Sequence, residues 1–325
     1  MESFIFAVNA VMPIILTVVI GYIIKRAGIL NEDTTKVMNK LVFRILLPSM
    51  LFLNIYKIES FASIDLGYIA YGITAVVVIF LISIPLIMMI TKENSQRGVL
   101  IQATFRSNFA LIGIPLASSL FGDEGAMVAT LLSAFAIPTL NILAVISLTV
   151  FGTGKPTLKK TLLGIVKNPL IQGVCAGCIA LIVRALFAEL GISFKLSDIK
   201  PIYTTLEYLG RCATPIALLV LGAQFEFSAI PALKHQIIWG TAIRTFIVPA
   251  VALVIAYFIG KFNGAHFAAF VALFGTPVAV SSVPMSQEMG GDSSLAGQMV
   301  VWTTIFSAFS LFIVSFVLKE IGIFI

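Results

Sequence analysis

The sequence predicts an all-α polytopic membrane protein of about ten transmembrane helices, and three observations support this prediction. The 325-residue chain is 59% hydrophobic and only 11% charged, with a mean hydropathy of +1.07. An average soluble domain is roughly 45–50% apolar and about 25% charged. Apolar runs of about 20 residues, long enough to cross a hydrocarbon core of roughly 30 Å, recur from end to end. The polar connections between them are short, so no soluble domain is expected.

The expected spans follow one another along the chain and end at polar or charged residues. They are 4–24, 34–56, 66–91, 97–121, 125–151, 168–187, 202–225, 236–260, 266–289 and 294–318. The first is expected to be retained, because it lacks the basic region and cleavage site of a signal peptide. The connection 152–167 is the most basic one. It separates a first unit of five spans, 1–151, from a second, 168–325.

Basic residues are unequally divided between the two sets of connections. Near odd-numbered connections lie Lys25, Arg26, Lys36, Lys92, Arg97, Lys155, Lys159, Lys160, Lys167 and Lys234; near even-numbered ones lie Lys57, Lys195, Lys200 and Lys261. Cytoplasmic loops carry the excess of Lys and Arg, so the odd connections are predicted to be cytoplasmic. Both termini are then outside a cell membrane. The scattered positive charge fits a lipid bilayer as partner and not a nucleic acid.

The two units contain matching motifs. "VFRILLPSMLFL" (42–53) and "LGRCATPIALLV" (209–220) each place an Arg four residues before a Pro. Span four also overlays span nine without a gap: Ala103, Phe105, Pro115, Gly122 and Asp123 match Ala272, Phe274, Pro284, Gly291 and Asp292. An odd number of spans per unit turns the second copy upside down in the membrane. Such inverted repeats are common in secondary transporters, which bind substrate where broken helices meet.

Spans four and nine are predicted to be broken helices. Pro115 lacks an N–H and clashes with the preceding turn, so the helical ladder is expected to open over 107–114, which includes Ser107, Asn108 and Gly113. Span nine contains Pro277 and Pro284 with Thr276, Ser281 and Ser282 beside them. Freed backbone groups require protein or water partners, and half-helix N-termini suit a carboxylate. A proline kink without a ligand is the alternative for either helix.

Charged and polar residues inside the spans complete the candidate site. Arg44, Arg106 and Arg211 are expected to supply positive potential, and Glu207 stands at the right spacing to pair with Arg211. Asn141 in span five is a further candidate for the pathway. Glu288, four residues after Pro284, is the candidate for coupling to an ion. Because acidic residues concentrate at span ends, a cation pump with paired carboxylates is disfavoured.

The segments "SNFALIGIPLASSLFGDEG" (107–125) and "TPVAVSSVPMSQEMGGDSSLAGQMVV" (276–301) resemble the auxin efflux carrier family. That family includes the plant PIN-formed carriers and bacterial permeases for malate or malonate. The resemblance implies two inverted five-helix repeats, a scaffold, a moving transport domain, and an elevator-like cycle. It also implies that the broken helices cross at their prolines, with Asn108 and Pro115 in the first and Pro284 in the second. A dimer through the scaffold is a further expectation from the family.

The sequence therefore predicts secondary transport of a small organic anion. The chain lacks the long loop of many plant carriers and has two serines at the second crossing, so a mono- or dicarboxylate such as malate or malonate is favoured over an auxin-like acid. H⁺, Na⁺ or exchange remain open as the driving force. An anion channel or a receptor-like sensor is the alternative. An enzyme is disfavoured because GxSxG and HExxH are absent, and no cofactor is expected. The Cys175-Cys178 pair is predicted to pack helices and not to bind metal.

Overall fold

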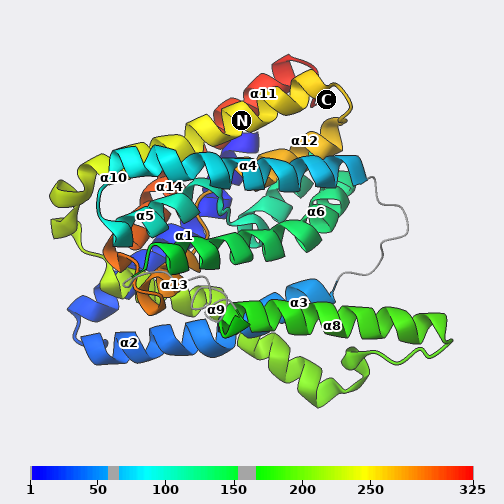
Figure 1. Ribbon diagram of the computed structural model, residues 1–325, viewed down its shortest axis with the longest axis horizontal. Helices are drawn as coiled ribbons and strands as arrows, with labels where there is room; N and C mark the ends of the chain where they lie inside the picture. Colours follow the sequence, from blue (N-terminus) through cyan, green and yellow to red (C-terminus); the bar gives the residue numbers. More distant parts are fainter. Residues whose placement is uncertain (1, 58–65, 153–165, 325) are drawn as a thin grey trace.

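A computed structural model describes residues 2–57, 66–152 and 166–324 of the chain. Within these ranges the structure is helical, and the only β-type pairing is one isolated bridge (Figure 1). Seven helices of the described part are long and apolar enough to cross a membrane: Glu32–Tyr56, Leu66–Ile90, Phe109–Val150, Pro169–Glu189, Lys200–Gln224, Phe227–Ile259 and Ser293–Glu320. The protein is thus all-α and polytopic, as its composition predicts. The basic connection 152–167, with Lys155, Lys159 and Lys160, lies almost entirely outside the described residues.

The helices correspond in order to the predicted spans. The first half contains α1 (Glu2–Arg26), α2 (Glu32–Leu41), η1 (Val42–Leu46), α3 (Leu47–Tyr56), α4 (Leu66–Ile90), α5 (Asn94–Phe105), η2 (Phe109–Gly113) and α6 (Ile114–Val150). The second contains α8 (Pro169–Glu189), α9 (Lys200–Gln224), α10 (Ile230–Ala242), η5 (Ile243–Ile247), α11 (Val248–Ile259), α12 (Gly264–Phe270), η6 (Val271–Gly275), α13 (Ser282–Glu288) and α14 (Ser293–Glu320). Single turns, η3 (Leu196–Asp198) and η4 (Phe227–Ala229), precede α9 and α10.

Short polar side chains begin several of these helices. Asn31, Asn168, Asn263 and Asp292 each accept a hydrogen bond from a backbone N–H in the first turn that follows them. A side-chain oxygen at this position pairs an N–H that the helix itself leaves free. These caps explain why α2, α8, α12 and α14 begin where the apolar pattern predicts a span boundary.

Four π-helical turns, η1, η2, η5 and η6, each end two residues before a proline: Pro48, Pro115, Pro249 and Pro277. A proline in an α-helix has no N–H to donate and its ring collides with the carbonyl four residues earlier. The wider π turn moves that carbonyl away and shifts the bonding by one residue. For example, the N–H of Ile114 bonds to Phe109. Most of the prolines thus change the helix locally without interrupting it.

Spans four and five join at a kink where a short loop was expected. Helix α6 continues through this region, and only Phe121 and Gly122 have non-helical backbone angles. Gly122 has φ +58° and ψ −149°, a conformation that is essentially restricted to glycine. The predicted boundary is therefore correct in position, but it is compressed into two residues.

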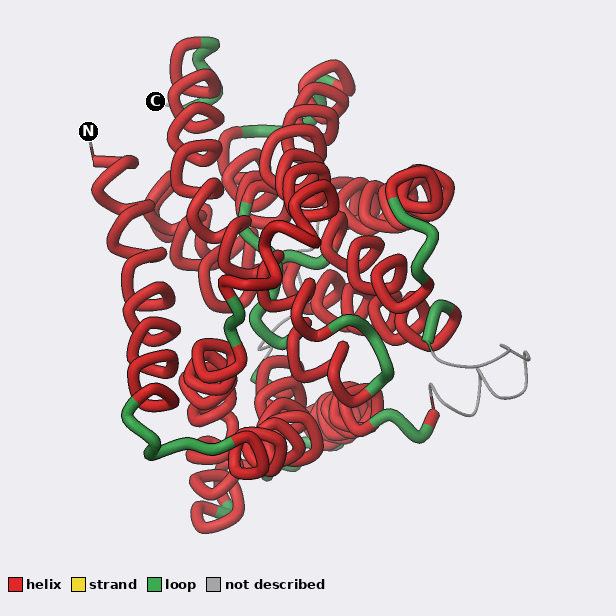
Figure 2. The backbone as a smooth tube through the Cα atoms, turned by 90° about the vertical axis from the view of Figure 1, so that its left-hand side faces the viewer, coloured by secondary structure: helices red, strands yellow, loops and turns green. Residues whose placement is uncertain are grey.

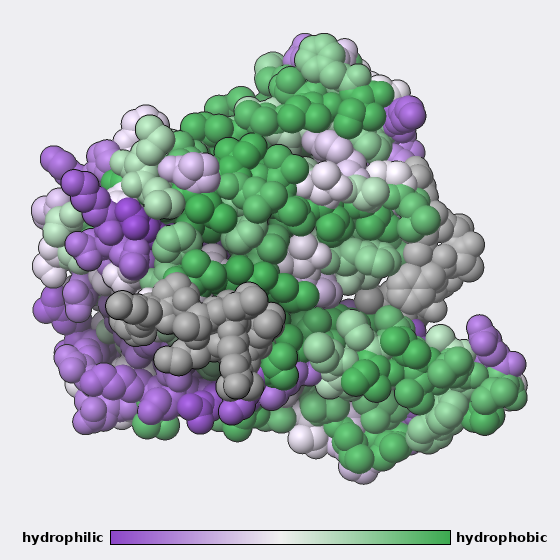
Figure 3. Space-filling model, viewed as in Figure 1, coloured by the Kyte–Doolittle hydropathy of each residue, from purple (hydrophilic) through white to green (hydrophobic). Residues whose placement is uncertain are grey.

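The helices form two packed bodies, and each body contains segments from both halves of the chain. One body contains α1, α2, α3, α8 and α9; the other contains α4 to α6 and α10 to α14 (Figures 1 and 2). They meet where α1 packs on α14 and where the short helix α13 touches α2, η1 and α9. Hydrophilic side chains gather at the left-hand end of Figure 3, where Figure 1 places the starts of α2 and α10. This end carries odd-numbered connections, which are predicted to be cytoplasmic, and that orientation stays a prediction.

Candidate functional site

Two interrupted helices cross inside the larger body. The chain is non-helical at 106–108, between α5 and η2, and again at 276–281, between η6 and α13. The N–H of Asn108 donates to the carbonyl of Pro277 at 2.8 Å, and the N–H of Ala279 donates to the carbonyl of Arg106 at 3.3 Å. Ser107 and Val278 form an antiparallel bridge between them. The two breaks therefore satisfy part of each other's freed backbone, which a lipid environment requires.

The register of this crossing agrees with the internal repeat. The gapless match of span four to span nine pairs Pro115 with Pro284, an offset of 284 − 115 = 169. The same offset pairs Asn108 with Pro277, and these two residues are hydrogen bonded across the crossing. The pairing supports the repeat. The division into inverted units 1–151 and 168–325 stays a prediction.

The crossing does not lie at Pro115 and Pro284, where the family resemblance placed it. Pro115 is the second residue of α6, after the π turn, and Pro284 is buried within α13. The expected opening over 107–114 is confined to its first two residues and the preceding Arg106, because 109–113 are π-helical. Only Pro277 is at the crossing itself. The π turn accommodates the missing N–H of Pro115, so that proline does not have to break its helix.

Gly113 allows the two π turns to pack closely. A Cβ atom added at this position would lie 2.9 Å from the carbonyl oxygen of Ala272 in η6. That distance is shorter than ordinary van der Waals contact, so only glycine fits without movement of the backbone. Gly113 therefore has a packing role at the contact between η2 and η6, and its predicted place in the substrate site stays a prediction.

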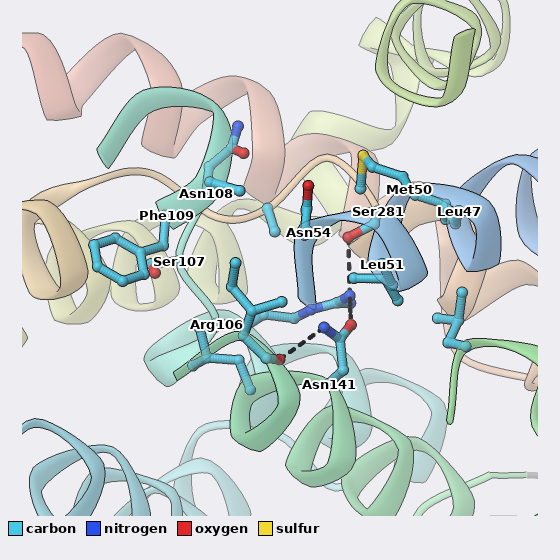
Figure 4. Close-up of a pocket in the computed structure, with 15 residues that line it drawn as sticks. Leu47, Met50, Leu51, Asn54, Arg106, Ser107, Asn108, Phe109, Asn141 and Ser281 are labelled. Carbon is cyan, nitrogen blue, oxygen red and sulfur yellow. Dashed lines mark hydrogen bonds between the residues drawn. The ribbon is translucent and has the colours of Figure 1, made fainter. Parts of the chain in front are cut away.

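Arg106 supplies a buried positive charge at the crossing. Its side chain is only 2% exposed and donates to Asn141 Oδ1 at 2.8 Å and Ser281 Oγ at 2.8 Å (Figure 4). It also reaches Gln102 Oε1 at 3.2 Å and Ser282 Oγ at 3.4 Å. All four acceptors are neutral, and the described part of the chain gives Arg106 no ion pair. A buried charge without a countercharge is costly, and charged residues inside membrane-spanning segments are rare.

A cavity of about 60 Å³ lies beside this arginine. Its polar lining is Asn54, Arg106, Ser107, Asn108, Asn141 and Ser281, and its apolar lining includes Leu47, Met50 and Leu51 from η1's neighbour α3 (Figure 4). No acidic side chain is among the lining residues. Each water in a cavity needs roughly 10–15 Å³ on this measure, so the space suits a few waters or a small polar group.

Two further spaces adjoin the inner cavity, and the three are called the connected cavities here because adjacent ones share lining residues. A cavity of about 190 Å³ shares Asn54, Asn108 and Ser281 with it. That cavity shares Asn54, Leu111 and Thr214 with an outer cleft of about 700 Å³. The outer cleft is lined by Pro115, Lys57, Glu207 and Arg211, and Lys57 Nζ is 2.7 Å from Glu207 Oε1. The shared lining residues connect the crossing to the surface between α3 and α9.

Arg244 in η5 stabilises the other side of the crossing. It is fully buried and donates to the carbonyls of Thr276 at 2.6 and 3.0 Å, Leu273 at 3.3 Å and Thr104 at 3.2 Å. These carbonyls lie at the C-terminal ends of η6 and α5, where a cation is favoured by the helix dipole. Arg244 lies within the predicted span 236–260, but the carbonyls that it binds are visible only in the folded chain.

Several predicted residues lie away from the inner cavity. Arg44 is exposed and lines none of the three connected cavities. Arg211 is also exposed and lies 3.8 Å from Glu207 in the outer cleft, which is the predicted pairing. Glu288 ends α13 and is half-buried outside these cavities. Thr276 is buried and its hydroxyl donates to Ala272, so it closes the end of η6.

Two broken helices cross here beside a cavity that is lined by an arginine and by no acidic residue. In an all-α membrane protein this arrangement is typical of transporters. Comparison with known proteins gives the family: the family model described as "Membrane transport protein" matches residues 6–151 and 155–315, so the chain belongs to that family. The match confirms the resemblance to the auxin efflux carriers seen in the sequence.

Two curated relatives cover nearly the same length. The chain is 25% identical to an uncharacterized transporter of Methanothermobacter thermautotrophicus, over 93% of this chain and 95% of the relative. It is 27% identical to an uncharacterized transporter of Methanocaldococcus jannaschii, over 92% of this chain and 94% of the relative. Both are described as transporters without a stated substrate.

Proposed function

We propose that this protein is a secondary active transporter of a small organic anion, a mono- or dicarboxylate such as malate or malonate. The observation that carries the proposal is the buried Arg106, which has neutral partners and lines a cavity without acidic residues. An auxin-like aromatic acid fits less well, because the inner cavity measures about 60 Å³ and its polar lining consists of amides, hydroxyls and one guanidinium.

Arg106 is the residue expected to bind the carboxylate. A guanidinium has five N–H donors and can give two parallel hydrogen bonds to one carboxylate. Bonds to a charged acceptor are stronger than bonds to Asn141 and Ser281, so an entering anion would replace these neutral acceptors. Asn108 and Ser281 would donate to the second oxygen, and the N-terminus of η2 at Phe109 adds a positive dipole end.

The two packed bodies provide the moving parts for an elevator cycle. The body with α4 to α6 and α10 to α14 contains the crossing, whereas α3 of the other body supplies Leu47, Met50 and Asn54. We assign the first body as the transport domain and the second as the scaffold. With the predicted topology, the connected cavities open to the outside, both termini are extracytoplasmic, and the protein resides in the cell membrane as a scaffold-mediated homodimer.

A polar cavity at the opposite end favours a carrier over an anion channel or a receptor-like sensor. It has about 720 Å³ and is lined by Lys25, Arg26, Glu32, Lys36 and Glu226, among others. It shares no lining residue with the three connected cavities. Access from one side at a time is the property of alternating access. H⁺, Na⁺ or exchange is proposed to drive transport, and Glu288 is the candidate residue for coupling to an ion.

Counterflow in proteoliposomes tests the proposal. Purified protein is reconstituted and assayed with labelled malate, malonate, acetate and an aromatic acid, comparing wild type with Arg106→Gln and Arg106→Lys. Loss of a charged hydrogen bond costs about 1.5–3 kcal/mol, so Arg106→Gln should raise the KM for the transported anion about 10- to 100-fold. Arg97→Gln, which changes an arginine in the first turn of α5, the helix that ends just before Arg106, is the matched control.

The possible outcomes test the mechanism, the binding site and the substrate class separately. Saturable counterflow supports a carrier, and flux that does not saturate supports a channel. Normal transport by Arg106→Gln would place the anion elsewhere. If none of the carboxylates moved in liposomes that contain the folded, reconstituted protein, the substrate class would be refuted.

A further inference from the structure

A second, separate groove lies on the surface between α10 and α14. It has about 400 Å³ and shares no lining residue with the connected cavities of the crossing. Its apolar lining comprises Ile230, Ile237, Ile238 and Phe246 from α10 and η5, and Trp302 and Phe306 from α14. The lining residues recur every three to five positions along α10, so the groove follows one face of that helix.

The groove lies between two helices that are long and apolar enough to face the hydrocarbon of a bilayer. Both of its walls belong to helices long and apolar enough to cross a membrane, Phe227–Ile259 and Ser293–Glu320. Ile238 is 62% exposed and Phe246 and Phe306 are about equally exposed on either wall, at 40% and 39%. An apolar ligand that enters from this side therefore comes from the lipid phase.

One end of the groove carries a positive charge. Lys234 is exposed, lines the groove, and has no ion-pair partner in the described part of the chain. It lies one turn after the start of α10, at the end of the molecule predicted to face the cytoplasm. Basic residues at this interface attract the anionic lipids of the cytoplasmic leaflet.

A buried hydroxyl lies deeper in the same groove. Thr241 is seven residues from Lys234, which corresponds to roughly 10 Å along the helix. It is 6% exposed, and its Oγ1 is buried without a hydrogen-bond partner among the residues that the structure describes. Thr245, Thr303 and Thr304, by contrast, donate to carbonyls of the preceding turn. An unpaired buried hydroxyl is unfavourable, and because Thr241 lines the groove, a ligand oxygen bound there would give it a partner.

From this arrangement we infer that the groove binds a phospholipid with an anionic headgroup from the cytoplasmic leaflet. One acyl chain lies along the apolar stripe between α10 and α14. The phosphate contacts Lys234, and an ester oxygen of the glycerol accepts a hydrogen bond from Thr241. Both walls belong to the body that contains the crossing, so the lipid is held by that body. The inference does not depend on the identity of the transported anion.

Lipid retention on the full-length protein tests the inference. Purified protein is delipidated and incubated with phosphatidylglycerol and phosphatidylcholine of identical acyl chains, and the lipid retained per protein is measured by native mass spectrometry. Wild type should retain phosphatidylglycerol at least several-fold over phosphatidylcholine. Lys234→Gln should remove that preference, and Thr241→Val should weaken retention of both lipids.

Two further variants separate this site from general surface binding. Ile238→Trp, at a mostly exposed position that tolerates a larger side chain, should block the groove and abolish retention of both lipids. Lys261→Gln changes an exposed lysine outside the groove and should behave as wild type. Equal retention of the two lipids by wild type, or an unchanged preference in Lys234→Gln, would overturn the inference.

Discussion

Replacement of Arg244 tests whether the crossing depends on a buried cation behind it. In Arg244→Met, an unbranched apolar side chain replaces the guanidinium, and the carbonyls of Thr104, Leu273 and Thr276 lose their donor. A buried unsatisfied polar group costs about 1–3 kcal/mol, so the gross loss is about 3–9 kcal/mol. The change also removes the desolvation cost of a buried charge, which is several kcal/mol. The expected net loss is therefore about 3 kcal/mol.

The assay combines thermal unfolding in detergent with counterflow in liposomes. Arg244→Met should lower the Tm clearly and abolish transport, because the two helix ends are no longer held together. Arg244→Lys keeps the charge but not the planar fork of donors, so it should be intermediate in both measurements. Arg184→Met is the control, since Arg184 donates to the carbonyl of Tyr56 and lies over its ring, away from the crossing, so its replacement should leave the crossing intact and lower the Tm less than Arg244→Met.

The reasoning about Arg244 would be refuted by a variant with unchanged Tm and unchanged transport. An unchanged Tm with lost transport would contradict the stability calculation and assign Arg244 a role in the cycle alone. If Arg184→Met lost as much stability as Arg244→Met, the location of Arg244 at the crossing would not explain its effect.

Three other substitutions follow from the same geometry. Asn39 is 1% exposed and both of its amide atoms are unpaired among the described residues, so Asn39→Leu should raise the Tm; a fall would show that the amide has a partner in the membrane. Gly113→Ala would bring a Cβ to 2.9 Å from Ala272 O and should destabilise by about 1–3 kcal/mol, whereas an unchanged unfolding curve would contradict the close packing. Gly122→Ala meets no atom within 4 Å and should cost about 1–3 kcal/mol through backbone strain alone, with Gly28→Ala as a comparison; no loss in calorimetry would argue against the kink.

Part of the candidate site was predictable because it lies in short contiguous segments. Ser107, Asn108 and Ser281 line the inner cavity, as the polar residues beside the predicted breaks indicated. Arg106 adjoins the first break in the sequence itself. The proline positions were less informative, since Pro115 and Pro284 follow the crossing and the π turn before Pro115 absorbs its effect.

The sequence could not rank the arginines. Each of three arginines, Arg44, Arg106 and Arg244, lies within an apolar span and is followed in the sequence by a proline or a predicted helix break. In the folded chain Arg44 is exposed, Arg106 faces the cavity, and Arg244 binds the carbonyls behind it. Because these helices are apolar on most sides, the hydrophobic pattern does not show which face is buried.

The sequence by itself determined the class of the protein, the order of its apolar segments and the two regions in which helices break. These are local properties: the length of an apolar run, the missing N–H of proline, and the freedom of glycine. Only the tertiary structure decided that Asn108 pairs with Pro277, that Asn141 and Ser281 surround Arg106, and that Arg244 joins the ends of α5 and η6. Those contacts join residues 32 to 175 positions apart, and the packing of helices sets which of them meet.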